Sequence, residues 1–125
     1  LDNGVRIVVT NSSKVYIGLN TKIGYSSILN CGANLNIGKN CLISGFVYIQ
    51  CSEHGFKKNI NIIDQQHSHK EINISEDVWI GAHSTILMGV NLKKGTIIGA
   101  NSLVNKDTEK NSINVGIPAK KIKER

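Results

Sequence analysis

Aliphatic residues recur at every sixth position over the C-terminal half of the chain. The members of this series are Ile74, Ile80, Ile86, Leu92, Ile98 and Val104. A second series of small or β-branched residues follows four positions after each aliphatic, at Val78, Ser84, Val90, Thr96, Ser102 and Thr108. A period of six is neither a helical nor a simple strand period. It predicts repeats of one short strand and one turn, each with one aliphatic side chain pointing inward.

The N-terminal half shows the same period with one change of phase. One phase contains Ile17, Ile23, Leu29 and Leu35, and a second phase, shifted by two residues, contains Ile37, Ile43 and Ile49. A two-residue insertion at a corner would produce this shift without disturbing a stack of repeats. Three repeats form a triangular coil of about 18 residues, and coils of parallel strands stack about 4.8 Å apart. The spacing therefore predicts an all-β parallel β-helix of hexapeptide repeats.

Two segments depart from the repeat. Residues from about 50 to 73 are polar and lack the aliphatic series, so an extruded loop that carries function is expected there. Residues from about 116 to 125 contain Gly116 and Pro118 before a basic stretch, which predicts a turn and a short C-terminal helix. This cap would cover the open last coil of a single domain over residues 1–125. The chain begins at Leu1 rather than methionine, which indicates trimming from a longer protein.

Composition narrows the class of protein. Hydrophobic residues make up 40% of the chain but aromatic residues only 5%, which suits a core of branched aliphatic side chains in sheets. No run of 18 apolar residues and no signal-peptide pattern is present, so we expect a cytoplasmic protein with no membrane span. Cys31, Cys41 and Cys51 are odd in number and lack C-x-x-C spacing, so they are expected to be reduced core residues and not metal ligands.

The net charge of +6 favours an anionic partner. Lys120, Lys121, Lys123 and Arg125 are concentrated at the C-terminus, which favours a phosphate-bearing ligand there. Nucleic acid is not expected as a partner, because the basic residues are not interleaved with aromatic ones.

Of the four histidines, His67 and His69 lie together where the repeat fails, while His54 and His83 stand apart from them in the sequence. A neutral imidazole near pH 7 is suited to removing a proton from a hydroxyl that attacks a carbonyl. No serine or cysteine lies in a nucleophile motif, so direct attack by the acceptor is favoured over a covalent intermediate. A single exposed histidine is more often a solvated surface residue, but the position of His67 and His69 where the repeat fails favours a catalytic role for one of them.

Four segments together resemble the bacterial hexapeptide acyltransferases. They are D-V-W-I-G-A at 77–82, I-G-A-N-S at 98–102, N-K-D at 105–107 and G-I-P-A-K at 116–120. The chain is most similar to the group of maltose, galactoside, streptogramin and capsule or lipopolysaccharide O-acetyltransferases, strongly over 74–125 and more loosely over 15–49. This resemblance implies a left-handed coil, acetyl-CoA as co-substrate and a homotrimer.

The resemblance also implies roles for individual residues. The general base would be His67, three residues after Asp64 as in the family pattern, with His69 as the second candidate. Trp79 would form a wall of the active site. Only 12 residues separate His67 from Trp79, fewer than in the sugar acetyltransferases with a longer loop, which changes the expected shape of the acceptor pocket.

For the coenzyme, the resemblance implies a groove between neighbouring subunits. The backbone at Gly81 and Ala82 would lie beside the thioester, where an N–H group could stabilise the oxyanion. Further coenzyme contacts would be the backbone at Ala100 and Asn105 and the lysines Lys106, Lys120 and Lys123, which would face the phosphates. Asn105 stands where the family usually has threonine.

The expected function is therefore acetyl transfer to a sugar hydroxyl of a surface polysaccharide or its precursor. An antibiotic or an amino-sugar amine remains open as the acceptor. Two alternatives to this function are a non-catalytic scaffold and an enzyme like the γ-class carbonic anhydrases. The latter resemblance requires two metal-binding histidines five residues apart, whereas the nearest pair here, His67 and His69, is two apart.

Overall fold

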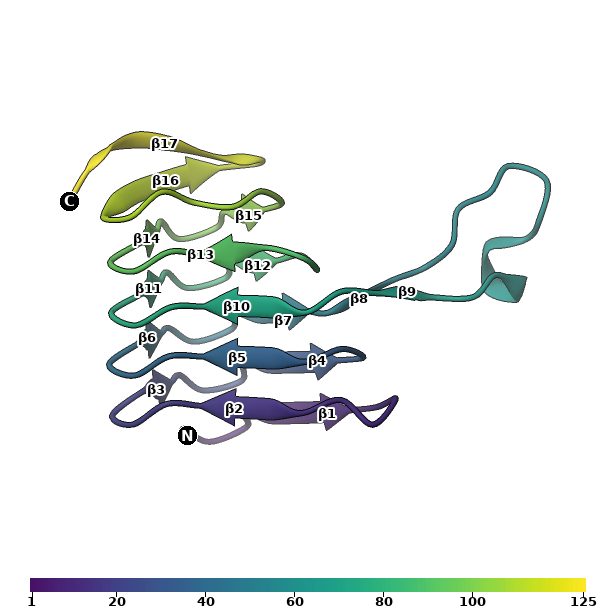
Figure 1. The fold of residues 1–125 in the computed structure, drawn as a ribbon, viewed down its shortest axis with the longest axis horizontal. Coiled ribbons are helices and arrows are strands. Elements are labelled where there is room, and N and C mark those ends of the chain that lie inside the picture. Colours follow the sequence, from purple (N-terminus) through teal and green to yellow (C-terminus); the bar gives the residue numbers. More distant parts are fainter.

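The computed structural model describes residues 1–125 as a stack of triangular coils with three parallel sheets as its sides (Figure 1). Sheet A contains β1 (Arg6–Val9), β4 (Ile28–Cys31), β7 (Tyr48–Gln50), β12 (Thr85–Ile86) and β15 (Leu103–Val104). Sheet B contains β2 (Val15–Ile17), β5 (Leu35–Ile37), β10 (Ile72–Ile74) and β13 (Asn91–Leu92). Sheet C contains β3 (Lys22–Ile23), β6 (Leu42–Ile43), β11 (Trp79–Ile80), β14 (Ile97–Ile98), β16 (Ser112–Gly116) and β17 (Ala119–Glu124).

The coil is left-handed. In Figure 1 the near strands of sheet B run leftward and the far strands of sheet A run rightward as the chain climbs from the N-terminus at the bottom to the C-terminus at the top. Seen from the C-terminal end, the approaching chain therefore turns clockwise, which defines a left-handed helix. The parallel β-helix expected from the repeat and the left-handed coil implied by the resemblance are thus both confirmed.

The two predicted series of residues form the interior. All six aliphatic residues from Ile74 to Val104 are at most 2% exposed, and the six residues of the second series are at most 8% exposed. Each aliphatic lies in register with its counterpart one coil away, as Ile80 does with Ile43 and Ile98. Branched side chains therefore stack in continuous columns along the coil axis, and no buried side-chain nitrogen or oxygen lacks a hydrogen-bond partner.

Additional residues enter the coil at only one of its three corners. The inward aliphatics of sheets B, C and A follow each other at steps of six, for example Ile37, Ile43 and Ile49. The step from sheet A to sheet B varies: it is eight residues from Leu29 to Ile37 and 25 from Ile49 to Ile74. We call this corner AB, and name the other two BC and CA. The two-residue shift predicted from the sequence is thus confirmed as an insertion at corner AB.

The predicted loop emerges from corner AB of the third coil as an arm (residues 51–71). Its two strands, β8 (Ser52–Glu53) and β9 (Ser68–His69), pair antiparallel, and a 3-10 helix, η1 (Ile62–Asp64), lies near its tip. Figure 1 shows the arm projecting well beyond the stack of coils. The strand pairing gives the arm a defined path away from the body.

The predicted C-terminal helix is wrong, because residues 119–124 form β17. This strand pairs antiparallel with β16, after a turn in which Gly116 has a φ of 107°. The outer edge of β16 would otherwise expose unpaired backbone N–H and C=O groups, and a helix could not satisfy them. The cap still covers the last coil, but with a strand, since pairing with the edge outweighs the helical preference of a lysine-rich segment.

Cys31, Cys41 and Cys51 are buried and unpaired, as expected from their spacing. Burial raises the pKa of the Cys41 thiol above its ordinary value of 9.0, which keeps this group protonated. No helix in the structure is long and apolar enough to span a membrane.

Candidate active site

Three imidazoles line the root of the arm. The register of β8 and β9 pairs Ser52 with His69 and Glu53 with Ser68, so His54 and His67 form the next cross-strand pair. The Nε2 atoms of His54 and His67 are 3.1 Å apart and their ring centroids 3.9 Å apart. The rings of His67 and His69 lie 6.0 Å apart. The antiparallel pairing thus brings together histidines that are up to 15 positions apart in the chain.

His69 is held through both ring nitrogens, one by the facing strand of the arm and the other by the body of the protein. Its Nδ1 atom lies 2.8 Å from the Ser52 hydroxyl, and its Nε2 atom lies 3.2 Å from the Asn11 amide nitrogen. Because the amide nitrogen is a donor, Nε2 of His69 accepts, and its Nδ1–H donates to Ser52. His69 therefore has no free lone pair for an acceptor hydroxyl, and its contacts anchor the arm to corner AB.

The His54–His67 pair keeps a free basic nitrogen. In this pair, one Nε2–H group donates to the lone pair on Nε2 of the other ring. The donor ring then holds its own lone pair at Nδ1, and both side chains are exposed. His54 was not among the site residues expected from the sequence, because it lies 13 positions before His67. The antiparallel path of the arm brings the two histidines together, and no local sequence signal marks where that path turns back.

Asp64 does not contact His67 through a hydrogen bond. It ends η1, and its Oδ2 atom accepts a hydrogen bond of 3.1 Å from the Asn61 amide. The arm is organised by the neighbouring Gln65 instead, whose Oε1 atom accepts from the backbone N–H of Lys57 at 2.7 Å. The amide of Gln65 also donates to the carbonyls of Lys57 and Ile60. These bonds tie the two sides of the arm together beyond the histidine pair.

Trp79 lies on a different side of the molecule from the arm. It belongs to β11 in sheet C, is 48% exposed, and donates from Nε1 to the Ser44 hydroxyl at 3.2 Å. Together with Leu42 and Ile97 it lines a shallow hollow of about 260 Å³. This exposed, largely apolar surface lies across the body from corner AB.

Gly81, Ala82 and Ala100 lie at corner CA, directly after strands of sheet C. The Gly81 N–H donates to the carbonyl of Ile98 at 2.8 Å, so it is not available to a ligand. The Ala82 carbonyl accepts from the N–H of Asn101, but the N–H of Ala82 has no partner in the protein. Of the two backbone donors predicted beside the thioester, Ala82 is thus the one that is free to bind an oxyanion.

Asn105 and Lys106 follow β15 at corner AB. Asn105 shares a hollow of about 320 Å³ with Ser52, Glu53 and Lys70 from the root of the arm. Lys106 lines a second hollow, of about 230 Å³, together with Lys120 on the last coil. The structure therefore brings two of the three predicted phosphate-binding lysines together. They lie at the C-terminal end of the stack, whereas the histidines lie on the arm that leaves the third coil.

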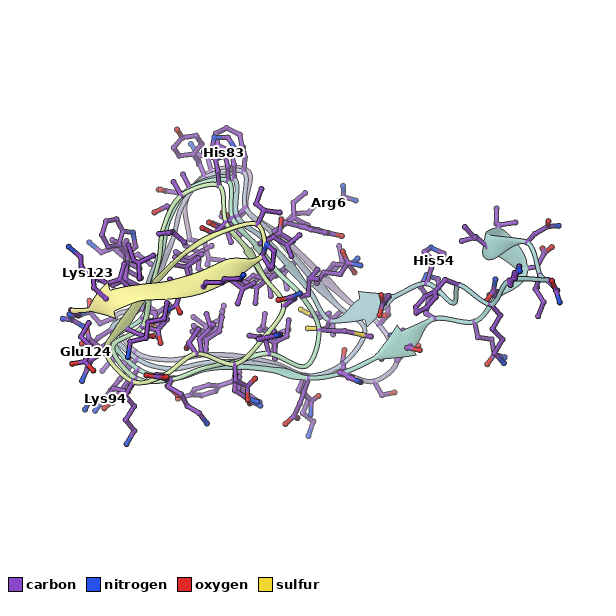
Figure 2. All side chains as sticks on the ribbon, turned by 90° about the horizontal axis from the view of Figure 1, so that it is seen from above. Arg6, His54, His83, Lys94, Lys123 and Glu124 are labelled. Carbon is purple, nitrogen blue, oxygen red and sulfur yellow. The ribbon has the colours of Figure 1, made fainter.

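The third predicted lysine, Lys123, lies elsewhere. Seen from above, the triangular section has His83 at one apex, Lys94, Lys123 and Glu124 at a second, and the arm with His54 at the third (Figure 2). Lys123 is exposed on β17 at corner BC, opposite the arm. Within one chain it does not join Lys106 and Lys120.

Most of the candidate site residues thus fall into two groups. The corner-AB group comprises the predicted His67, Asn105 and Lys106 together with His54, and the sheet-C group comprises Trp79, Gly81, Ala82 and Ala100. The body of the coil separates the groups within one chain.

Comparisons with known proteins agree with this fold and these motifs, although no family model matches the chain. The chain is 30% identical to galactoside O-acetyltransferase of Escherichia coli (strain K12), over 90% of this chain and 55% of the relative. It is 25% identical to the putative lipopolysaccharide biosynthesis O-acetyl transferase WbbJ of the same organism, over 96% of this chain and 65% of the relative. The chain thus spans between 55% and 65% of the length of these two relatives.

Solved structures give the same result. A polySia-specific acetyltransferase, NeuO, superimposes with a TM-score of 0.86 at 35% identity, over 96% of this chain and 56% of that one. A galactoside acetyltransferase in complex with coenzyme A superimposes with a TM-score of 0.90 at 27% identity, over 99% of this chain and 60% of that one. On its six-residue repeat, its left-handed coil and these likenesses, the chain belongs to the hexapeptide-repeat acyltransferase family.

Proposed function

We propose that this chain transfers an acetyl group from acetyl-CoA to a hydroxyl of a sugar, within a surface polysaccharide or its precursor. The observation that carries the proposal is the hollow that Asn105 shares with Ser52 and Glu53, because it joins a predicted coenzyme contact to the root of the histidine arm. The names of the relatives refer to galactosides, lipopolysaccharide biosynthesis and polySia, and so support a saccharide as acceptor.

The His54–His67 pair acts as the general base. The free nitrogen of the pair takes the proton from the acceptor hydroxyl, and the oxygen attacks the acetyl carbonyl of the thioester. The N–H of Ala82 stabilises the oxyanion that forms, since it has no competing partner in the protein. The imidazole then returns its proton to the departing thiolate. Acetyl-CoA supplies the activated acetyl group, and Lys106 and Lys120 attract its phosphates.

The active protein is a homotrimer. The corner-AB group and the sheet-C group lie on different sides of one chain, so a complete site needs the arm of one copy against Trp79 and Ala82 of the next. Closed cyclic symmetry brings the same two surfaces together in every copy. The apolar hollow of Leu42, Trp79 and Ile97 fits such a contact. Three unpaired cysteines fit the reducing cytoplasm as the location.

The test of the function is release of free CoA thiol from acetyl-CoA in the presence of galactosides, maltose, nucleotide sugars and oligosialic acid. We expect turnover with at least one saccharide and none with water alone. A rise in melting temperature on adding CoA is expected in addition. If no saccharide supports thiol release and CoA leaves the melting temperature unchanged, the chain is a scaffold and the proposal fails.

Shared sites have their own test. A variant lacking both His54 and His67 is mixed with a Trp79→Ala variant under conditions that exchange subunits. With random exchange in a trimer, about a quarter of the sites combine an intact arm with an intact Trp79. We expect this mixture to regain activity that neither parent has. A mixture as inactive as its parents, formed from subunits shown to exchange, would contradict the shared site.

A further inference from the structure

We propose that His54 and His67 form a binding site for a divalent transition-metal ion such as Zn²⁺, and that the bound ion blocks acetyl transfer. The binding half of this inference stands on the geometry of the pair alone. The inhibitory half rests on the proposed function, because it assumes that the same pair is the base.

The distance between the two ring nitrogens matches the bite of a metal ion. Zinc binds histidine nitrogen at about 2.0–2.1 Å. Two such nitrogens that subtend between 90° and the tetrahedral angle are about 2.9–3.4 Å apart. The Nε2 atoms of His54 and His67 are 3.1 Å apart, within this range. A metal ion can therefore replace the shared proton without moving the two strands apart.

The backbone holds the pair in this arrangement before any ion arrives. β8 and β9 fix the cross-strand register on one side of the pair. On the other side, the N–H of Gly55 donates to the carbonyl of Gln66 at 3.1 Å. Because the backbone already holds the two residues opposite each other, binding an ion requires no ordering of the two strands. Both imidazoles are also exposed, which leaves room for water molecules to complete the coordination.

The site offers two protein ligands and no more. The nearest further imidazole, His69, uses its nitrogens on Ser52 and Asn11. No group of three or more histidine, cysteine or carboxylate side chains is arranged around one point. Two imidazole ligands select borderline transition metals over Mg²⁺ and Ca²⁺, with Cu²⁺ bound more tightly than Zn²⁺.

Occupancy removes the base by a simple rearrangement. In the free pair, one ring has its proton on Nε2 and its lone pair on Nδ1. When the ion takes both Nε2 lone pairs, that proton moves through solvent to Nδ1, and both rings remain neutral with an N–H at Nδ1. No ring nitrogen is then left to accept a proton from the acceptor hydroxyl. The ion and the transferred proton thus compete for the same lone pairs.

The test is calorimetric titration of the full chain with ZnCl₂, in the absence of acetyl-CoA. We expect one equivalent of Zn²⁺ per chain, with at least about tenfold weaker binding in His54→Gln and in His67→Gln. His83→Gln is the matched control, since His83 is an exposed histidine at a different apex of the triangle, stacked on Phe46. Its affinity for Zn²⁺ should equal that of the wild type. Equal Zn²⁺ affinity in all four proteins, or a loss confined to His83→Gln, would overturn the site.

A second measurement keeps the result independent of folding and activity. On addition of Cu²⁺, ring signals of His54 and His67 in nuclear magnetic resonance spectra should broaden while those of His83 persist. In the transfer assay, Zn²⁺ should inhibit and a chelator should restore turnover. Zn²⁺ binding without any transfer activity would defeat the proposed function but not the site. Transfer that is insensitive to saturating Zn²⁺ would defeat the inhibitory role.

Discussion

Gly81 packs against the backbone of Ala100 one coil further along the chain, and a Cβ atom at Gly81 would come within 2.5 Å of the Ala100 nitrogen. The same close approach recurs at Gly18 and Gly24, where an added Cβ would meet the backbone of the next coil at 2.5 Å. Successive coils are about 4.8 Å apart, and at these three turns the backbone of the next coil lies where a side chain would begin. Glycine at these three positions is thus required by the close approach of the next coil, whereas other inward aliphatics, such as Ile43 and Ile86, are followed by the larger Ser44 and Leu87.

Replacing Gly81 by alanine should therefore destabilise the coil. We expect a loss of about 1–3 kcal/mol, because the backbone of the neighbouring coil must shift to admit the methyl group. Denaturant titration of the wild type and the variant measures this loss. Gly45→Ala is the control, since its added Cβ would meet the nearest atom, the Tyr25 carbonyl oxygen, at 3.2 Å. An equal loss in both variants would refute the stacking explanation.

A second prediction concerns the stability contributed by the column of buried aliphatic side chains. Ile86 is completely buried, so Ile86→Ala should cost about 2–5 kcal/mol through lost burial and the cavity left behind. Ile63, near the tip of the arm, is 86% exposed, and Ile63→Ala should change stability by less than about 0.5 kcal/mol. Thermal and denaturant unfolding of both variants provide the measurement. A small cost at Ile86 would mean that the column does not carry the stability of the coil.

A surface carboxylate makes a prediction about pH. The Lys94 ammonium, 2.7 Å from Glu76, and then Lys39 hold the pKa of Glu76 below its ordinary value of 4.5. Because the folded-state pKa is lowered, the stabilisation is present above pH 4.5 and is lost as the pH falls through the folded-state pKa. In Lys94→Gln, the Glu76 pKa should rise towards 4.5.

Titration of the Glu76 carboxyl by nuclear magnetic resonance measures this pKa directly. Lys93→Gln removes a neighbouring charge that has no ion-pair partner and serves as the control. The control should leave the Glu76 pKa closer to the wild-type value than Lys94→Gln does. If both substitutions raise it equally, general charge and not the ion pair is the cause.

The imidazoles make a prediction about catalysis. His54→Ala and His67→Ala should each lower kcat by about 10²–10⁴, the contribution of a general base. Each change removes either the base itself or the partner that sets its tautomer. Melting temperature and CoA binding should stay near those of the wild type, because both side chains are exposed. Steady-state kinetics with saturating acetyl-CoA decide the matter. Wild-type turnover in either variant would remove that histidine from the mechanism.

His69 should behave differently. Because it anchors the arm through Ser52 and Asn11, His69→Ala should loosen the root of the arm rather than abolish proton transfer. Hydrogen exchange at residues 51–71 should become faster, and the Michaelis constant for the acceptor should rise more than kcat falls. A loss of kcat as large as in His67→Ala, with unchanged hydrogen exchange, would assign the base to His69.

Much of the fold was predictable because the six-residue series reports directly on burial. The strands of the body from β3 to β7 and from β10 to β15 each contribute at least one buried aliphatic, so Ile80 and Ile98 mark the interior without any knowledge of the sheets. The C-terminal strand was not predictable in the same way. Residues 119–125 have no inward partner, and their conformation depends on the unpaired edge of β16, which no local pattern reveals.

The site was predictable in its residue types but less so in its arrangement. The places of Trp79 and Ala82 could be predicted, because Trp79 lies in β11 and Ala82 follows that strand by two residues. Contacts across the arm could not be predicted in this way, since His67 pairs with His54 and not with His69 or Asp64, which are nearer in the sequence. Side-chain pairing in a hairpin depends on where the chain turns back, and the polar sequence between residues 54 and 67 does not mark that point.

The confinement of extra residues to corner AB has a consequence for how such proteins diversify. Inward aliphatics follow each other at steps of six around the other two corners. The column of Ile43, Ile80 and Ile98 is therefore unchanged whatever is added between sheets A and B. A segment of different length or composition can thus be exchanged for the arm without redesigning the body, because its ends always leave from and return to neighbouring strands. Grafting the corresponding segment from a relative onto this chain is accordingly expected to change the acceptor of the proposed transfer while the body of the coil is retained.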